Sequence, residues 1–146
     1  MKVTTIGFTQ KSARRFFSLI KQAEVRTVLD VRLNKTSQLA GFAKKLDLEF
    51  FLSELLDVKY LDLCELAPER EFLKRYQSGE LAWDDYAEAY LELLAKRQVE
   101  SNLDAAVFDR GCLLCSEHRP DRCHRRLAVE YLNSQWSGRL SVEHLV

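Results

Sequence analysis

The run at residues 27–31 constrains the fold of this chain most. Its sequence, Thr-Val-Leu-Asp-Val, is nearly all apolar and has the length of one strand. Such a run is typical of a strand that is covered on both faces, as in a parallel sheet. Further strand patterns occur at residues 3–6, 58–63, 111–115 and 140–145. Because helical patterns separate these strands, we predict a three-layer α/β domain with a mostly parallel sheet.

Helical periodicity fills the segments between the predicted strands. Ser12 is suited to cap the first helix, and residues 47–56 have the pattern of a second, amphipathic helix. Residues 69–100 contain no proline and are rich in helix formers, which predicts a long helical excursion before the cysteine-rich strand, interrupted at Gly79. Aromatic residues at helical spacing in this excursion are predicted to be core residues: Trp83, Tyr86 and Tyr90.

The composition is that of an ordinary globular protein. With 146 residues, of which 47% are hydrophobic and 30% charged, we expect a single α/β domain over residues 1–146. Lysine plus arginine equal aspartate plus glutamate at 22 each, so any binding to nucleic acid has to be local. No apolar run has membrane-spanning length, and the first residues read as a strand rather than a signal peptide. We therefore expect a cytoplasmic protein without membrane association.

Most of the reactive side chains gather in residues 111–126. This segment holds three of the four cysteines, two of the three histidines and four arginines. Pro120 suits the first position of a helix, so we predict a helix from Pro120 to about Ser134 after the strand. In a parallel sheet, ligands collect at the carboxyl ends of strands, where helix N-termini attract anions. Because Arg119 is a poor N-cap, we expect the first-turn N–H groups to be left for a ligand.

Four side chains of this segment are candidate catalytic groups. His124 falls on the buried side of the predicted helix, where it can be a base, a metal ligand or a structural histidine. Cys123 lies near a helix N-terminus among arginines, which lowers a thiol pKa, although a half-buried apolar role fits it equally well. Cys115 can face the same cavity or the core. Glu117 can act as an acid or base, or be a solvated carboxylate.

The spacing of cysteines and histidines in this segment raises the question of a metal site. Cys112 and Cys115, followed by His118, Cys123 and His124, resemble a zinc ligand set. However, residues three apart on a strand point to opposite faces, so these two thiols cannot easily reach one ion. We therefore predict no metal site.

The end of the run at residues 27–31 brings charged groups to the same edge of the sheet. Asp30 and Arg32 are two residues apart and share a face. They can simply pair, or Arg32 can bind an anion while Asp30 holds it in place. Thr9 offers a hydroxyl after the first strand. The polar segment at residues 36–45 is long for a turn, as binding loops commonly are.

Several of these segments together resemble a known family. They are residues 5–9, 30–32, 37–42, 112–117 and 123–126. With this combination the chain resembles, over nearly its whole length, the domain of unknown function 488 family. The resemblance implies a single α/β domain of Rossmann-like layering with an uncharacterised activity. By position it implies that the following residues surround a shared site: Thr9, Asp30, Arg32, Cys115, Glu117, Cys123, His124 and Arg125.

Two positions depart from the pattern of that family. Phe8 stands where members often carry histidine, so a mechanism that needs a second imidazole is not expected here. Arg119 stands where an aspartate often precedes the proline, which makes this helix entry more basic.

We predict an enzyme-like pocket for an anionic ligand such as a nucleotide or another phosphorylated metabolite. The candidate catalytic residues are Cys115, Glu117, Cys123 and His124. The candidate anion-binding residues are Thr9, Asp30, Arg32, Arg125 and Arg126. The sequence predicts no particular cofactor or oligomeric state, and it leaves open whether the protein is an enzyme.

Two alternatives stay open. One is a non-catalytic nucleic-acid-binding module, whose affinity would depend on salt because each neutralised phosphate releases counterions. Its local basic rim would be formed by Lys44, Lys45, Arg119, Arg122 and Arg126. The other is a redox or interaction protein that uses exposed thiols, Cys123 in particular.

Overall fold

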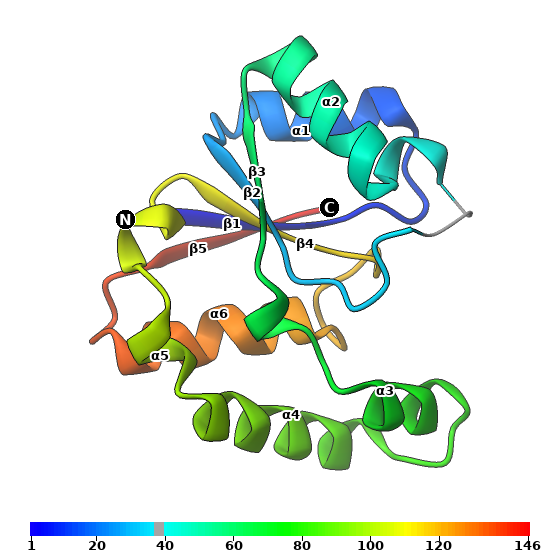
Figure 1. Cartoon of the computed structure of the whole chain (residues 1–146), viewed down its shortest axis with the longest axis vertical. Helices are drawn as coiled ribbons and strands as arrows, with labels where there is room; N and C mark the ends of the chain where they lie inside the picture. The colour runs from blue at the N-terminus through cyan, green and yellow to red at the C-terminus, as the bar shows by residue number, and fades with distance from the viewer. Residues whose placement is uncertain (37–39) are drawn as a thin grey trace.

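The computed structural model describes residues 1–36 and 40–146 and contains a five-stranded sheet (Figure 1). The strand order is β3-β2-β4-β1-β5, and every neighbouring pair is parallel. The strands are β1 (Lys2–Gly7), β2 (Thr27–Asp30), β3 (Lys59–Asp62), β4 (Gly111–Cys115) and β5 (Ser141–Leu145). The predicted α/β class and parallel sheet are therefore confirmed, with each strand at its expected place.

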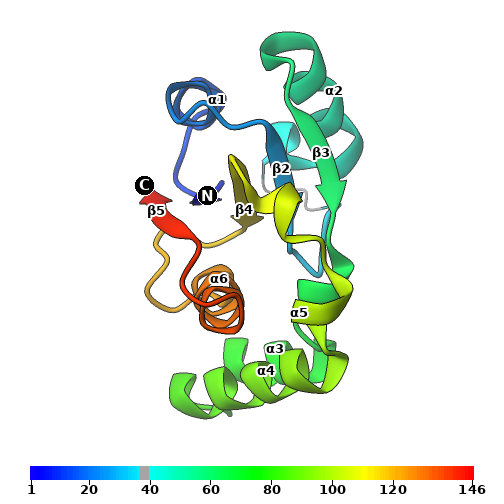
Figure 2. The ribbon, with the colours of Figure 1, turned by 90° about the vertical axis from the view of Figure 1, so that its left-hand side faces the viewer.

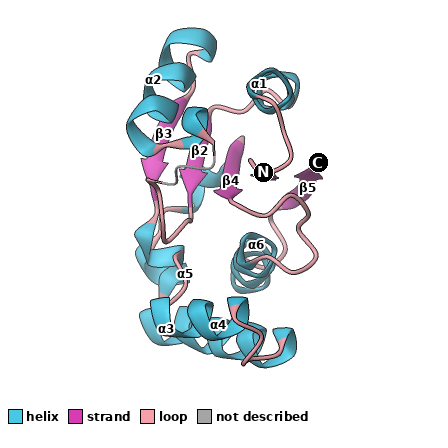
Figure 3. Ribbon diagram, turned by 90° about the vertical axis from the view of Figure 1, so that its right-hand side faces the viewer, coloured by secondary structure: helices cyan, strands magenta, loops and turns pink. Residues whose placement is uncertain are grey.

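Helices cover both faces of the sheet, which gives the predicted layered arrangement (Figures 2 and 3). The first face carries α1 (Ala13–Gln22) and α2 (Lys45–Leu56), and the second carries α6 (His124–Gln135). Alternate residues of β2 explain its apolar run, because Val28 packs with the first face and Leu29 with the second. Beyond α6 lie α3 (Arg70–Gln77) and α4 (Trp83–Arg97), and α5 (Val99–Asn102) lies beside α6.

The predicted helical excursion is confirmed in α3, α4 and α5. Gly79, with a φ of 82°, lies in the connection between α3 and α4. Tyr86 and Tyr90 are buried as expected, whereas Trp83 is only partly buried. The Tyr90 hydroxyl donates to the Leu66 carbonyl oxygen at 2.8 Å, which joins α4 to the short 3-10 helix Cys64–Leu66 after β3. None of the helices in the described ranges has both the length and the apolar character that crossing a membrane requires.

The last helix begins four residues later than predicted. α6 starts at His124, and its N-cap Cys123 has an extended backbone with φ −136° and ψ 138°. Pro120 instead opens a turn, in which its carbonyl oxygen accepts from the Cys123 N–H at 3.2 Å. The prediction of a helix from Pro120 is therefore wrong, because the fixed φ of proline suits a turn as well as a helix start. As a result, residues 116–122 form a loop at the carboxyl end of β4.

This loop lies directly against the end of β1. A Cβ atom added to Gly7 would lie 1.5 Å from the Glu117 carbonyl oxygen, so only glycine permits this approach. The hydroxyl and the N–H of Thr9 both donate to the Ser116 carbonyl oxygen, at 2.7 and 3.2 Å. The connections that follow β1 and β4 are thereby fixed to each other.

Candidate functional site

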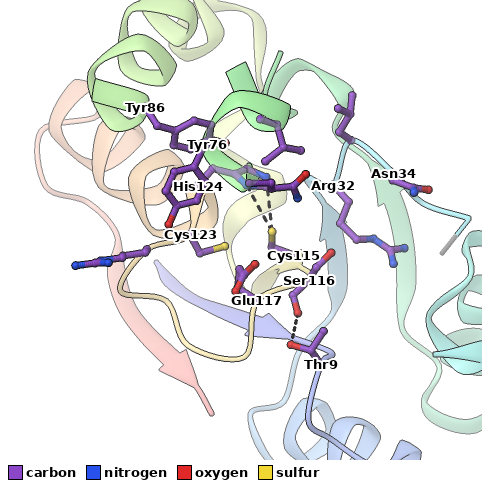
Figure 4. A pocket seen from close by; sticks show the side chains of 14 residues that line it. Thr9, Arg32, Asn34, Tyr76, Tyr86, Cys115, Ser116, Glu117, Cys123 and His124 are labelled. Carbon is purple, nitrogen blue, oxygen red and sulfur yellow. Dashed lines mark hydrogen bonds between the residues drawn. The ribbon is translucent and has the colours of Figure 1, made fainter. Parts of the chain in front are cut away.

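A cavity of about 350 Å³ lies at the carboxyl edge of the sheet (Figure 4). β1 and β4 are neighbours there, but β1 continues into α1 on one face and β4 into α6 on the other. Open α/β sheets bind ligands at such points, because the diverging connections leave a crevice. We call this space the site cavity. It is lined by Thr9, Arg32, Leu33, Asn34, Leu73, Tyr76, Gln77, Tyr86, Cys115, Ser116, Glu117, Arg122, Cys123 and His124.

A thiol and an imidazole face each other in the wall of the site cavity. The Sγ atom of Cys115, the last residue of β4, lies 3.5 Å from Nδ1 of His124, the first residue of α6 (Figure 4). The other ring nitrogen, Nε2, lies 2.8 Å from the Val31 carbonyl oxygen. Because a carbonyl can only accept, Nε2 carries the hydrogen. The sulfur also lies 3.8 Å from Nε2, so it is nearly equidistant from the two ring nitrogens.

A second thiol, that of Cys123, completes this cluster. The Sγ atoms of Cys115 and Cys123 and a ring nitrogen of His124 all lie within 4.8 Å of one another. A hydrogen bond from Cys123 lowers the pKa of the Cys115 thiol despite its burial, with further help from the N–H of Glu117. Burial raises the pKa of Cys123, and its hydrogen bond to Cys115 raises it further. Of the two interpretations that the sequence leaves open for Cys123, the apolar one fits and the lowered pKa does not, because the thiol is buried rather than exposed among the arginines.

The predicted pairing of Asp30 and Arg32 is present. Nε and Nη2 of Arg32 donate to the two carboxylate oxygens at 2.9 and 2.8 Å, and Nη1 donates to the Ala43 carbonyl oxygen at 2.7 Å. Asp30 also accepts from the Tyr60 hydroxyl at 2.5 Å, and the guanidinium lies 5.4 Å from the centre of the Phe8 ring. Asp30 is thus behind the wall of the site cavity, whereas Arg32 lines it and keeps unengaged N–H groups.

The other two arginines predicted to bind an anion are not in the wall of the site cavity. Arg125 is fully buried, and its guanidinium donates to the carbonyl oxygens of Glu117 and His118 and to the Thr5 hydroxyl. Arg125 therefore fixes the loop at residues 116–122 through hydrogen bonds from the interior of the protein. Arg126 is partly exposed and lies 3.7 Å from the carboxylate of Glu130.

The polar rim of the site cavity comes from the loop at residues 116–122. The carboxylate residue Glu117 and the cationic residue Arg122 are both exposed and line the cavity. Glu117 is a predicted catalytic residue, whereas Arg122 was expected only in the basic rim. Its place at the cavity depends on the late start of α6, which the sequence did not indicate. Residues 37–39 of the predicted binding loop lie outside the described residues.

A wall that the sequence analysis missed is formed by the helical excursion. Tyr76 of α3 and Tyr86 of α4 stack with ring centres 4.9 Å apart and line the site cavity. The helical spacing of the aromatic residues predicted a buried face, but it gave no sign that this face ends at a cavity. Tyr86 is 2% exposed, and its hydroxyl has no hydrogen-bond partner among the described residues. Burial raises its pKa, and the nearby Cys115 and Cys123 raise it further.

Cys112 takes no part in the cluster. It packs with the core beneath α1 and α2, whereas Cys115 packs with the opposite core. Burial raises the pKa of Cys112 to about 12. The prediction that these two thiols point to opposite faces of the sheet is confirmed.

Fold and site together define a parallel α/β protein with a thiol-imidazole cluster at the carboxyl edge of its sheet. The chain belongs to the family described as Domain of unknown function DUF488, whose model matches residues 12–132. This match confirms the resemblance found in the sequence. Neither a search of curated proteins nor a search of solved structures gave a match.

Proposed function

We propose that this protein is an enzyme that binds a small anionic molecule in the site cavity and acts on it through Cys115 and His124. One observation carries the proposal: the Cys115 thiol and His124 Nδ1 meet at 3.5 Å in the wall of a cavity. The cavity, at about 350 Å³, falls in the range typical of small-molecule sites. Thiol and imidazole are the side chains most often used for nucleophilic and acid-base chemistry near neutral pH.

The expectation of an anionic ligand rests on the hydrogen-bond donors around the cavity. Arg122 offers an exposed guanidinium, and Arg32, whose charge Asp30 neutralises, offers only the N–H groups that Asp30 and Ala43 leave unengaged. At the start of α6, the side chain of the N-cap residue Cys123 accepts no hydrogen bond from the first-turn N–H groups. The positive end of the helix dipole therefore adds to the attraction of an anion.

Thermal unfolding in the presence of small anions tests this proposal. We expect inorganic phosphate, pyrophosphate or a nucleoside monophosphate to raise the midpoint of the wild-type protein, because a ligand that binds the folded state stabilises it. Arg122→Gln should weaken that stabilisation. Arg14→Gln, at an exposed arginine on α1 away from the cavity, is the matched control. No stabilisation by any of these anions, or equal losses in both variants, would contradict the proposal.

The nucleic-acid-binding alternative has less support. Two members of the expected basic rim lie beside carboxylates, with Lys45 at 3.2 Å from Asp62 and Arg126 at 3.7 Å from Glu130. These neighbours reduce the positive charge available to phosphates. We therefore do not propose this function.

A further inference from the structure

We propose that Cys115, Cys123 and His124 bind a divalent transition metal ion, with zinc as the best match, and leave its fourth position open toward the site cavity. This inference deepens the proposed function, on which its meaning for catalysis rests. The donor set is two sulfurs and one nitrogen, all within 4.8 Å of one another. Thiolate and imidazole are the ligands that zinc prefers.

The spacing of the donors fits tetrahedral coordination. Zinc lies about 2.3 Å from a cysteine sulfur and about 2.0–2.1 Å from a histidine nitrogen. At a tetrahedral angle these bond lengths separate sulfur and nitrogen by about 3.5 Å. The observed distance between Cys115 Sγ and His124 Nδ1 is 3.5 Å. The separation of these two donors therefore fits one ion. Because Nε2 lies 3.8 Å from the same sulfur, coordination through Nδ1 also requires the imidazole ring to turn so that its lone pair is directed to the ion.

The groups around the donors have the character of an outer coordination sphere. A ligating histidine usually donates its other N–H to a carbonyl or carboxylate, and His124 Nε2 donates to the Val31 carbonyl oxygen at 2.8 Å. Nη1 of Arg125 lies 3.7 Å from Cys123 Sγ, where it can stabilise a thiolate.

A second observation indicates that the ion would keep an open position. All three donors line the site cavity, so a fourth ligand would come from the cavity itself. The buried Tyr86 hydroxyl lines the same cavity and has no hydrogen-bond partner among the described residues. A water molecule on the metal would supply that partner. Three protein ligands plus one water is the arrangement of catalytic zinc sites, in contrast to the four protein ligands of structural sites.

The expectation of no metal came from a different pair of thiols. Cys112 and Cys115 do point to opposite faces of the sheet and cannot share an ion. The cluster instead combines the end of β4 with the start of α6, across the loop at residues 116–122. Its closeness depends on Gly7, which lets that loop approach β1.

Cobalt(II) titration of metal-free protein tests the inference without any assay of activity. We expect one ion per chain, with the sulfur-to-cobalt charge-transfer absorption of thiolate ligands and the intense visible bands of a tetrahedral site. Zinc should displace the cobalt. Cys123→Ser and His124→Gln should weaken binding by more than about 100-fold, since loss of an outer-sphere partner alone costs up to that factor. Cys64→Ser is the matched control, because Cys64 is an exposed free cysteine outside the cluster.

A measurement on the wild-type protein covers the case in which a variant fails to fold. Zinc should protect Cys115 and Cys123, but not the exposed Cys64, from alkylation, as read by mass spectrometry of each site. Absence of cobalt absorption, or equal alkylation with and without zinc, would overturn the inference. Anion stabilisation is measured with and without zinc, which separates the two proposals. Metal binding without any stabilisation by anions would contradict only the proposed function. Stabilisation by anions without metal binding would contradict only the metal site.

Discussion

Two buried arginines near the carboxyl edge of the sheet have opposite electrostatic surroundings. Arg32, which follows β2, pairs through two nitrogens with Asp30 and lines the site cavity. Arg125, in the first turn of α6, donates to carbonyl oxygens and to the Thr5 hydroxyl. The described residues give Arg125 no ion-pair partner. The charge of Arg32 is thus cancelled locally, whereas that of Arg125 acts on its neighbours.

The charge of Arg125 lowers the pKa values of two neighbouring side chains. Burial, followed by the charges of Arg125 and Arg15, lowers the pKa of Lys11 to about 8. Burial and then Arg125 lower the pKa of His144. The comparison shows that a buried arginine with a carboxylate partner has little electrostatic effect beyond the pair. A buried arginine without such a partner shifts the pKa values of titratable groups around it.

The largest expected effect tests the pairing of Arg32. Arg32→Met leaves the Asp30 carboxylate buried without its partner, so we expect the free energy of unfolding to fall by about 3–5 kcal/mol in urea titrations. Arg125→Met leaves no buried anion behind and should cost less, about 1–3 kcal/mol, through unpaired carbonyl oxygens. The double variant Asp30→Asn/Arg32→Met should recover part of the loss. Equal losses in the two single variants would remove the distinction between the arginines.

A second prediction concerns the loop that Arg125 holds. In Gly7→Ala the new Cβ would lie 1.5 Å from the Glu117 carbonyl oxygen, so the loop has to move. We expect a loss of about 3 kcal/mol in the free energy of unfolding. Gly41→Ala is the matched control, since a Cβ there meets nothing within 4 Å. If both variants unfold alike in urea, the loop at residues 116–122 is not held tightly against the end of β1.

The smallest effect is on pH dependence. Thr5 Oγ1 accepts from Arg125 Nε, so its hydroxyl hydrogen is free to donate to His144 Nδ1 at 2.7 Å. Burial and then Arg125 lower the pKa of His144, with Arg126 acting in the same direction and Glu130 and Asp121 against it. The unfolded chain therefore binds more protons below about pH 6.5. Stability should fall as the pH decreases from there, by at most about 1.4 kcal/mol per pH unit.

Urea unfolding at about pH 7.5 and about pH 5.5 measures this slope. His144→Gln should remove the contribution, and Arg125→Met should reduce it. A slope that is unchanged in Arg125→Met would show that the charge of Arg125 does not reach His144.

Local sequence patterns predicted the fold well because each pattern depends on the burial or backbone conformation of its own segment. The apolar run of β2 reflects burial on both faces, and the position of Gly79 reflects a backbone with positive φ. The start of α6 was missed because proline suits a turn and a first helical turn alike. At the site, the convergence of the strand ends followed from the parallel sheet. The different environments of Arg32 and Arg125 did not, since they depend on contacts between segments far apart in sequence.

The walls of the site cavity have two separate origins. Cys115, Cys123 and His124 come from the sheet edge and α6, while Leu73, Tyr76, Gln77 and Tyr86 come from α3 and α4. The two walls meet at α4, because the Tyr90 ring lies 5.5 Å from the His124 ring. Changes in α3 would therefore alter mainly the entrance to the cavity, whereas changes in α4 would also alter the surroundings of the three inner groups.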